Sequence, residues 1–228
     1  MTRFLTAAYS ITPFPKLWAD KLSELMSPYG VTDVVDLGSG SGGPIFRVVE
    51  ELRARGFKAN VTLTDLYPNV GGSLPYWPQP VDAAAVPDAL SGIRTMFASF
   101  HHFRPQAAHE ILRDAFQRRR PIAIFEATSR TPAAVASTLA IPILVLVLTP
   151  RIRPLSWTQL LFTYLLPILP VLIFWDGLIS QLRTYSAPEL EELTRDLQAP
   201  EYRWQAGLIH APGIPTGVPF LIGRPGSH

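Results

Sequence analysis

The sequence predicts an α/β fold built on a mostly parallel sheet, and three observations support this prediction. An apolar strand, a glycine-rich turn, a helix and a second short strand follow one another between residues 31 and 65. Two strands joined in this way by a helix form a β-α-β crossover, which implies parallel pairing. The alternation of strand and helix patterns continues to residue 126, and residues 202–209 and 218–222 have the pattern of a closing antiparallel strand pair.

Each element in the first half follows from its local pattern. We expect the first strand at Val31–Leu37, a helix at Ile45–Arg55 that ends before Gly56, and the second strand at Asn60–Thr64. Residues 66–90 are rich in proline, glycine and alanine, so they are expected to be mainly loop with one weak strand.

The second half is interpreted in the same way. Counting the weak strand as the third, Arg94–Phe100 is the fourth strand and Pro121–Phe125 is the fifth, with a helix at Gln106–Gln117 between them. Ser186 has the pattern of the N-cap of a further helix, because a proline and an acidic residue follow it at the expected positions.

Length and composition limit the possible classes. The chain has 228 residues, 47% hydrophobic and 17% charged, which is typical of one globular domain over residues 1–228. It has no cysteine, which excludes disulfides, cysteine-ligated metals and thiol catalysis. A net charge of +2 is too small to indicate a nucleic-acid partner. Residues 1–30 contain an amphipathic helix at Phe14–Met26 and no secretory signal pattern, so a cytoplasmic protein is expected.

Residues 131–175 form an apolar insertion after the fifth strand. Thr131–Pro150 and Pro154–Trp175 contain no Asp, Glu, Lys or Arg, and Arg151 and Arg153 lie between them. Each run is long enough to cross a bilayer, but straight spanning helices are disfavoured by Pro142, Pro150, Pro154, Pro167 and Pro170. Two interpretations are favoured over full spanning: helices that enter one leaflet or cap an apolar pocket, and buried core helices.

A glycine-rich motif lies where the first strand gives way to the first helix. It contains Asp36, Gly38, Gly40, Gly42 and Gly43. Glycines allow a tight turn and close approach of a ligand to the backbone, and the following helix N-terminus offers free N–H groups. The run also matches the dinucleotide pattern G-x-G-x-x-G. The carboxylate of Asp36 favours a positively charged nucleoside over a pyrophosphate at this place.

Two later acidic positions support a nucleoside site. Asp65 follows the second strand, at the distance expected for a carboxylate that accepts hydrogen bonds from ribose hydroxyls. Asp82 and Ala83 precede the fourth strand and could meet an adenine amino group, although Asp82 could equally cap a turn.

Taken together, these features resemble the class I S-adenosylmethionine-dependent methyltransferases, from about Val31 to the C-terminus. The stretch from Trp175 to Ser186 is similar to one in uncharacterised bacterial members. The resemblance implies a Rossmann-like methyltransferase sheet with helices on both faces and a C-terminal antiparallel strand pair, and the apolar insertion departs from it. It also implies a cofactor site for S-adenosylmethionine. Its residues would be Asp36, Gly38, Gly40 and Gly42 at the methionine part, Asp65 at the ribose, Leu66, Asp82 and Ala83 at the adenine, and Ser99 and Phe100 along the cofactor.

Candidate catalytic residues lie near the same edge of the sheet. His101 and His102 follow the fourth strand, and either could remove a proton from an acceptor. The alternative is a structural pair, with one histidine buried and hydrogen-bonded and the other exposed. Asp176 follows twenty-two uncharged residues and could act as a base or bind substrate. Glu126 is expected to cap a helix or pair with Arg130, and no metal site is expected.

The sequence therefore predicts S-adenosylmethionine-dependent methyl transfer to a lipophilic small molecule or lipid, with the insertion capping the acceptor pocket. The insertion could also contact a membrane peripherally. Its aromatic side chains could line the acceptor pocket or pack as core. Two alternatives remain open: a membrane-associated nucleoside-binding protein without catalysis, and a nicotinamide-dependent oxidoreductase.

Overall fold

Six strands form one mixed sheet in the computed structural model, which describes residues 2–27, 33–69, 72–152, 154–210 and 216–226. The strand order is β2-β1-β3-β4-β6-β5. The first four strands are parallel, and β6 runs antiparallel to both β4 and β5. The strands are β1 (Asp33–Asp36), β2 (Asn60–Leu63), β3 (Ile93–Phe97), β4 (Ile122–Phe125), β5 (Tyr202–Ile209) and β6 (Val218–Pro225).

This topology confirms the predicted fold class and corrects one expected strand. Val31 and Thr32, which were expected in the first strand, lie outside the described residues. The weak strand expected in residues 66–90 is wrong for the part of that segment that the structure describes, where only a single bridge joins Tyr76 to Leu63. Proline and glycine interrupt the segment too often for a longer ladder. The strand expected as the fifth is therefore β4.

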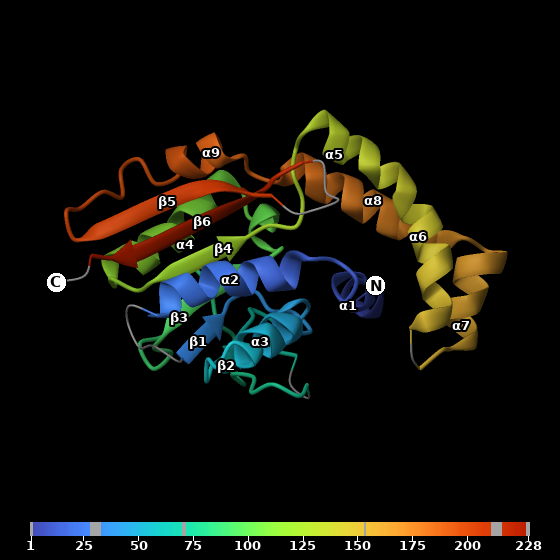
Figure 1. Ribbon diagram of the computed structural model, residues 1–228, viewed down its shortest axis with the longest axis horizontal. Coiled ribbons are helices and arrows are strands. Elements are labelled where there is room, and N and C mark those ends of the chain that lie inside the picture. Colours follow the sequence, from blue (N-terminus) through green and yellow to red (C-terminus); the bar gives the residue numbers. More distant parts are fainter. Residues whose placement is uncertain (1, 28–32, 70–71, 153, 211–215, 227–228) are drawn as a thin grey trace.

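Helices cover both faces of the sheet (Figure 1). Helices α2 (Phe14–Met26) and α3 (Ile45–Ala54) bury their apolar sides on one face. Helices α4 (Pro105–Gln117) and α9 (Ala187–Glu192) do so on the other. Because side chains alternate along a strand, β1, β3, β4 and β6 contribute buried side chains to both cores.

The core beneath α2 is aromatic. Trp18 is fully buried, and its ring centroid lies 5.5 Å from that of Phe97 on β3 and 6.4 Å from that of Phe125 on β4. Buried aromatic side chains contribute strongly to stability through their large apolar area. This packing holds the carboxyl ends of β3 and β4 in place, where the candidate site lies.

A helical arm, residues 132–183, extends from one end of the sheet, with α1 (Thr2–Tyr9) beside it (Figure 1). Short 3₁₀ and π turns separate its helices, and prolines stand near the starts of several of them. A proline is tolerated at a helix start but breaks a helix interior, so the segment becomes a series of short pieces. The pieces are α5 (Pro132–Ser137), η3 (Thr138–Ala140), α6 (Ile141–Leu148), η4 (Thr149–Arg151), α7 (Trp157–Leu160), η5 (Leu161–Leu165) and α8 (Ile168–Arg183).

Much of the arm's apolar surface is exposed. Within Pro132–Arg151, taken as one helical segment, an 18-residue window has a mean hydropathy of 2.1, and only 28% of that window is buried. By length and composition it could cross a membrane, whereas Trp157–Leu165 and Ile168–Arg183 meet at a bend of 77°. This exposure does not fit the alternative that the first uncharged run, Thr131–Pro150, is a buried core helix. Arg153, expected at an interface between the two runs, lies outside the described residues.

Candidate active site

The glycine motif forms a loop between β1 and α3. Gly38, Gly40 and Gly42 have φ angles of +64°, +54° and +89°, in the left-handed region that favours glycine. A Cβ atom on Gly42 would lie 2.2 Å from Cε2 of Phe46 in α3, so this position also lacks space for a side chain. The loop therefore presents bare backbone at the carboxyl edge of the sheet, as the sequence predicted.

Asp36 ends β1 and is buried within this loop. The Thr95 hydroxyl donates a hydrogen bond of 2.9 Å to its Oδ1, and the Thr64 hydroxyl donates one of 2.8 Å to its backbone carbonyl. Burial raises the pKa of Asp36 to about 7, against the opposing effect of its hydrogen bonds. A cation placed beside this carboxyl would favour its ionised form.

Asp65 joins the end of β2 to the glycine loop. Its Oδ2 accepts a hydrogen bond of 2.9 Å from the Gly40 N–H, and its Oδ1 accepts one of 2.9 Å from the Tyr67 N–H. Leu66 is 51% exposed at the same edge. These positions suit the expected contacts with a ribose and an adenine, which stay predictions.

Asp82 takes the turn-capping position that the sequence left open. Its Oδ1 accepts a hydrogen bond of 2.9 Å from the Ala84 N–H, and its side chain is exposed. Ala83 is buried beside it. A contact of this pair with adenine stays a prediction.

The end of β3 contributes a strained turn and an unsatisfied polar atom. Ala98 has a φ of +51°, a conformation that non-glycine residues adopt mainly where surrounding structure imposes it. The Ser99 hydroxyl is buried and has no hydrogen-bond partner among the described residues. A Cβ atom on Gly38 would lie 3.8 Å from this hydroxyl, so the turn after β3 adjoins the glycine loop. Phe100, which is buried, then begins the short helix η2 (Phe100–His102).

His101 and Glu126 form a buried pair at the carboxyl ends of β3 and β4. Nδ1 of His101 lies 2.8 Å from Oε2 of Glu126, and the His101 backbone N–H donates to Oε1 at 2.9 Å. The Nε2 atom of His101 has no partner among the described residues. With Nδ1–H donated to the carboxylate, Nε2 keeps a free lone pair.

The expected pairing of Glu126 with Arg130 is therefore wrong. Arg130 instead donates two hydrogen bonds of 2.6 Å to the carboxylate of Glu189, near the start of α9. The sequence did carry a signal for the His101–Glu126 pair. Each of the two residues follows one of two neighbouring parallel strands, and the carboxyl ends of such strands meet at one edge of the sheet.

His102 is the more exposed of the two histidines and faces α8. Partial burial, and then His101, lowers its pKa, while Asp176 and Glu126 act in the opposite direction. The structure therefore brings Asp176 within electrostatic reach of His102. The arrangement of one buried, hydrogen-bonded histidine and one exposed histidine matches the structural alternative, and catalytic roles for the three residues stay predictions.

Tyr9 is a residue that the sequence analysis missed. It ends α1, its ring centroid is 5.7 Å from that of Trp18, and both burial and the charge of Glu126 raise its pKa. The last residue of α1 thus lies close enough to the histidine–glutamate pair to sense its charge. Its position depends on tertiary packing, for which the local sequence carries no signal.

A cavity of about 330 Å³ opens beside this pair. It is lined by His101, His102, Arg104, Arg130, Arg183 and Glu189, together with Phe103, Pro105 and Tyr185. None of these lining residues belongs to the insertion at 131–175. Within the part of the chain that the structure describes, no cluster of three His, Asp or Glu residues could hold a metal ion.

Comparison with solved structures identifies similar folds. The plantazolicin methyltransferase BpumL, in complex with a triazolic desmethylPZN analog and SAH, has a TM-score of 0.57 at 13% identity, covering 96% of this chain and 88% of that chain. BpumL in complex with SAH has a TM-score of 0.54 at 12% identity, covering 99% and 84%. An O-methyltransferase family protein from Burkholderia thailandensis has a TM-score of 0.50 at 16% identity, covering 92% of this chain but 55% of that chain.

These likenesses show that the chain has the fold of S-adenosylmethionine-dependent methyltransferases, which confirms the predicted resemblance at the level of fold. No protein-family model matches the sequence, and no curated protein matches it.

Proposed function

We propose that the protein transfers a methyl group from S-adenosylmethionine to a lipophilic small molecule or lipid. The observation that carries the proposal is that the glycine loop, with Asp36 and Asp65, lies at the same carboxyl edge of the sheet as the His101–Glu126 pair. A donor site and a proton acceptor are both needed for methyl transfer to a hydroxyl or amine, and here neighbouring strands supply them.

The residues of the loop suit S-adenosylmethionine. When bound, this cofactor supplies an electrophilic methyl group on a positively charged sulfur. Asp36 offers a buried carboxyl that a cation would hold ionised, and the unpartnered hydroxyl of Ser99 offers a hydrogen-bonding atom next to Gly38. The left-handed glycines leave the backbone open to close approach.

His101 is the proposed general base. Its Nε2 takes the proton of the acceptor as the new bond to the methyl carbon forms and the bond from that carbon to sulfur breaks. The carboxylate of Glu126 fixes the Nδ1–H tautomer and stabilises the imidazolium that results. Such a base contributes about 10²- to 10⁴-fold in rate.

The arm supports a lipophilic acceptor. A second cavity, of about 550 Å³, lies within the arm and beside α1, and its apolar lining includes Phe4, Val145, Ile152, Phe162, Leu169 and Ile173. This volume is in the range of small-molecule sites. Helix α8 lines this cavity with Ile173 and ends at Arg183 in the cavity beside His101, so one helix connects both places. Exposed apolar residues of the arm also suit peripheral contact with a membrane.

Calorimetry tests the cofactor assignment. We expect saturable one-site binding of S-adenosylmethionine and S-adenosylhomocysteine by the full chain, and no comparable binding of NAD or NADP. Binding of the dinucleotides alone would replace the proposal with an oxidoreductase. A turnover assay with lipophilic acceptors then separates an enzyme from a protein that only binds the nucleoside.

A further inference from the structure

We infer that the acceptor carries an anionic group, a carboxylate or phosphate, that binds in the cavity beside His101 between Arg104 and Arg183. This inference rests on the proposed function, because it treats that cavity as the place where the acceptor lies. We call the cavity the arginine pocket; its charged lining is Arg104, Arg130, Arg183 and Glu189. With the histidines neutral, three arginines and one glutamate give a charge of +2.

Only one of the three arginines is neutralised within the pocket. The guanidinium of Arg130 holds both carboxylate oxygens of Glu189 at 2.6 Å, and this contact lowers the pKa of Glu189 to about 2. Among the described residues, the side chains of Arg104 and Arg183 have neither an ion-pair partner nor a hydrogen-bond partner. The two cations therefore remain available to a ligand.

The walls of the pocket are fixed by tertiary contacts. Arg104 directly precedes α4, and Arg183 is the last residue of α8. The Tyr185 hydroxyl donates a hydrogen bond of 2.7 Å to the carbonyl of Phe103, which ties the segment after α8 to the residue before Arg104. Because this bond joins the two walls, the arginines are held at one cavity rather than on separate loops.

An anion fits this chemistry better than a neutral polar group. Guanidinium groups bind carboxylates and phosphates through paired, charge-assisted hydrogen bonds. Asp176 also acts on the charge of His102, but it does not line the pocket. Combined with the apolar cavity of the arm, an anion here makes an amphiphile the acceptor class. Its charged end would lie within reach of His101.

Calorimetry with decanoate, decanol and inorganic phosphate tests the inference on the full chain without cofactor. Decanoate and decanol have equal chain lengths and differ in charge, so we expect decanoate to bind and decanol to bind at least tenfold more weakly. Phosphate distinguishes the source of the anion: binding as tight as that of decanoate indicates a small free anion, and weaker binding indicates that the chain contributes.

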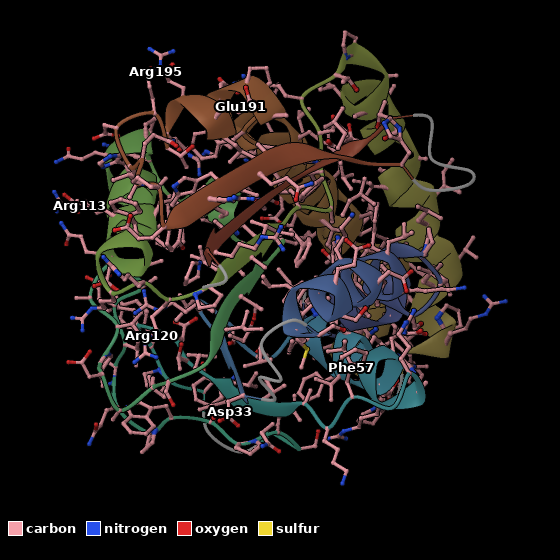
Figure 2. All side chains as sticks on the ribbon, turned by 60° about the vertical axis from the view of Figure 1, so that its left-hand side comes forward. Asp33, Phe57, Arg113, Arg120, Glu191 and Arg195 are labelled. Atoms are coloured by element: carbon pink, nitrogen blue, oxygen red, sulfur yellow. The ribbon has the colours of Figure 1, made fainter. Side chains whose placement is uncertain are left out.

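Variants separate the pocket from the overall charge of the protein. Arg104→Gln and Arg183→Gln should each weaken decanoate binding about tenfold. Arg113→Gln is the matched control, because it removes the same single positive charge. Arg113 is exposed on α4 and points away from the rest of the protein (Figure 2). Unchanged decanoate binding in both pocket variants, an equal loss in Arg113→Gln, or no binding of either anion to the wild type would overturn the inference.

Binding of S-adenosylhomocysteine, measured on the same samples, keeps the two proposals apart. If this ligand binds but the anions do not, the anion site is wrong and the proposed function stands. If the anions bind through Arg104 and Arg183 but S-adenosylhomocysteine does not, the anion site stands without methyl transfer. Retained S-adenosylhomocysteine binding in the arginine variants also shows that they fold.

Discussion

Asp36 is a carboxyl group that the fold buries at the end of β1, and this burial raises its pKa to about 7. In the unfolded chain the pKa of an aspartate is about 3.9, so between these two values the folded state binds more protons than the unfolded state. Stability from this group is therefore complete below about pH 4 and is lost as pH rises toward 7. The loss amounts to about 4 kcal/mol at most.

Asp36→Asn should therefore stabilise the protein while weakening its binding of a cationic ligand. We expect a higher Tm than wild type at pH 8, with the difference shrinking toward pH 5, because the variant has no buried charge. S-adenosylmethionine should bind the wild type more tightly at pH 8 than at pH 6, and the variant should lose that dependence. Thermal melts and calorimetry at both pH values measure these effects. A variant that binds like the wild type would contradict the role given to Asp36.

The roles of His101 and His102 in methyl transfer can be distinguished by substitution, because Glu126 holds the His101 side chain. His101→Gln should reduce the turnover number for methyl transfer about 100-fold or more, because it removes the group held by Glu126. Glu126→Gln should also reduce turnover, since the tautomer of His101 is then no longer fixed. Binding of S-adenosylhomocysteine should persist in both variants. His102→Gln is the control, and a loss as large as that of His101→Gln would contradict the choice of His101.

The loop between β1 and α3 depends on its glycines to different degrees. Gly42 and Gly40 both have positive φ, but only at Gly42 would a Cβ atom meet a neighbour, the ring of Phe46. Gly40→Ala should cost about 1 kcal/mol for the backbone conformation alone. Gly42→Ala should cost more, because the ring must also move. Unfolding in urea measures both; equal losses would show that Phe46 adjusts freely.

Local patterns predicted the elements well, and non-local contacts explain the failures. The amphipathic spacing of α2 gave its bounds, Phe14–Met26, because helix periodicity is a property of adjacent residues. The pairing of Glu126 was mispredicted because Arg130 was chosen by proximity in sequence. Its observed partner, His101, is twenty-five residues away and is brought close by the pairing of β3 with β4.

At the scale of the whole molecule, apolar and charged surfaces lie in different places: the arm exposes apolar side chains, and the charged pocket lies at one end of the arm. The sequence predicted the uncharged runs and their broken helices, but it could not show that they leave the sheet, because a core helix has the same composition. Exposed apolar side chains such as Leu139, Val147, Trp157 and Leu165 lie along the arm, whereas the arginine pocket lies where the arm ends at Arg183. This polarity suits an enzyme that takes an amphiphilic acceptor from a lipid surface.

Vesicle co-sedimentation tests that arrangement. The wild type should sediment with phosphatidylcholine–phosphatidylglycerol vesicles, because exposed apolar side chains gain free energy on leaving water. Val147→Glu combined with Leu165→Glu should lower the bound fraction at least tenfold, since each charge would have to enter an apolar phase. Leu208→Glu is the matched control: Leu208 is 47% exposed on β5, outside the arm, and its substitution should leave vesicle binding unchanged. A wild type that stays in the supernatant, with self-association seen by light scattering, would instead assign the arm's apolar surface to a second copy of the chain.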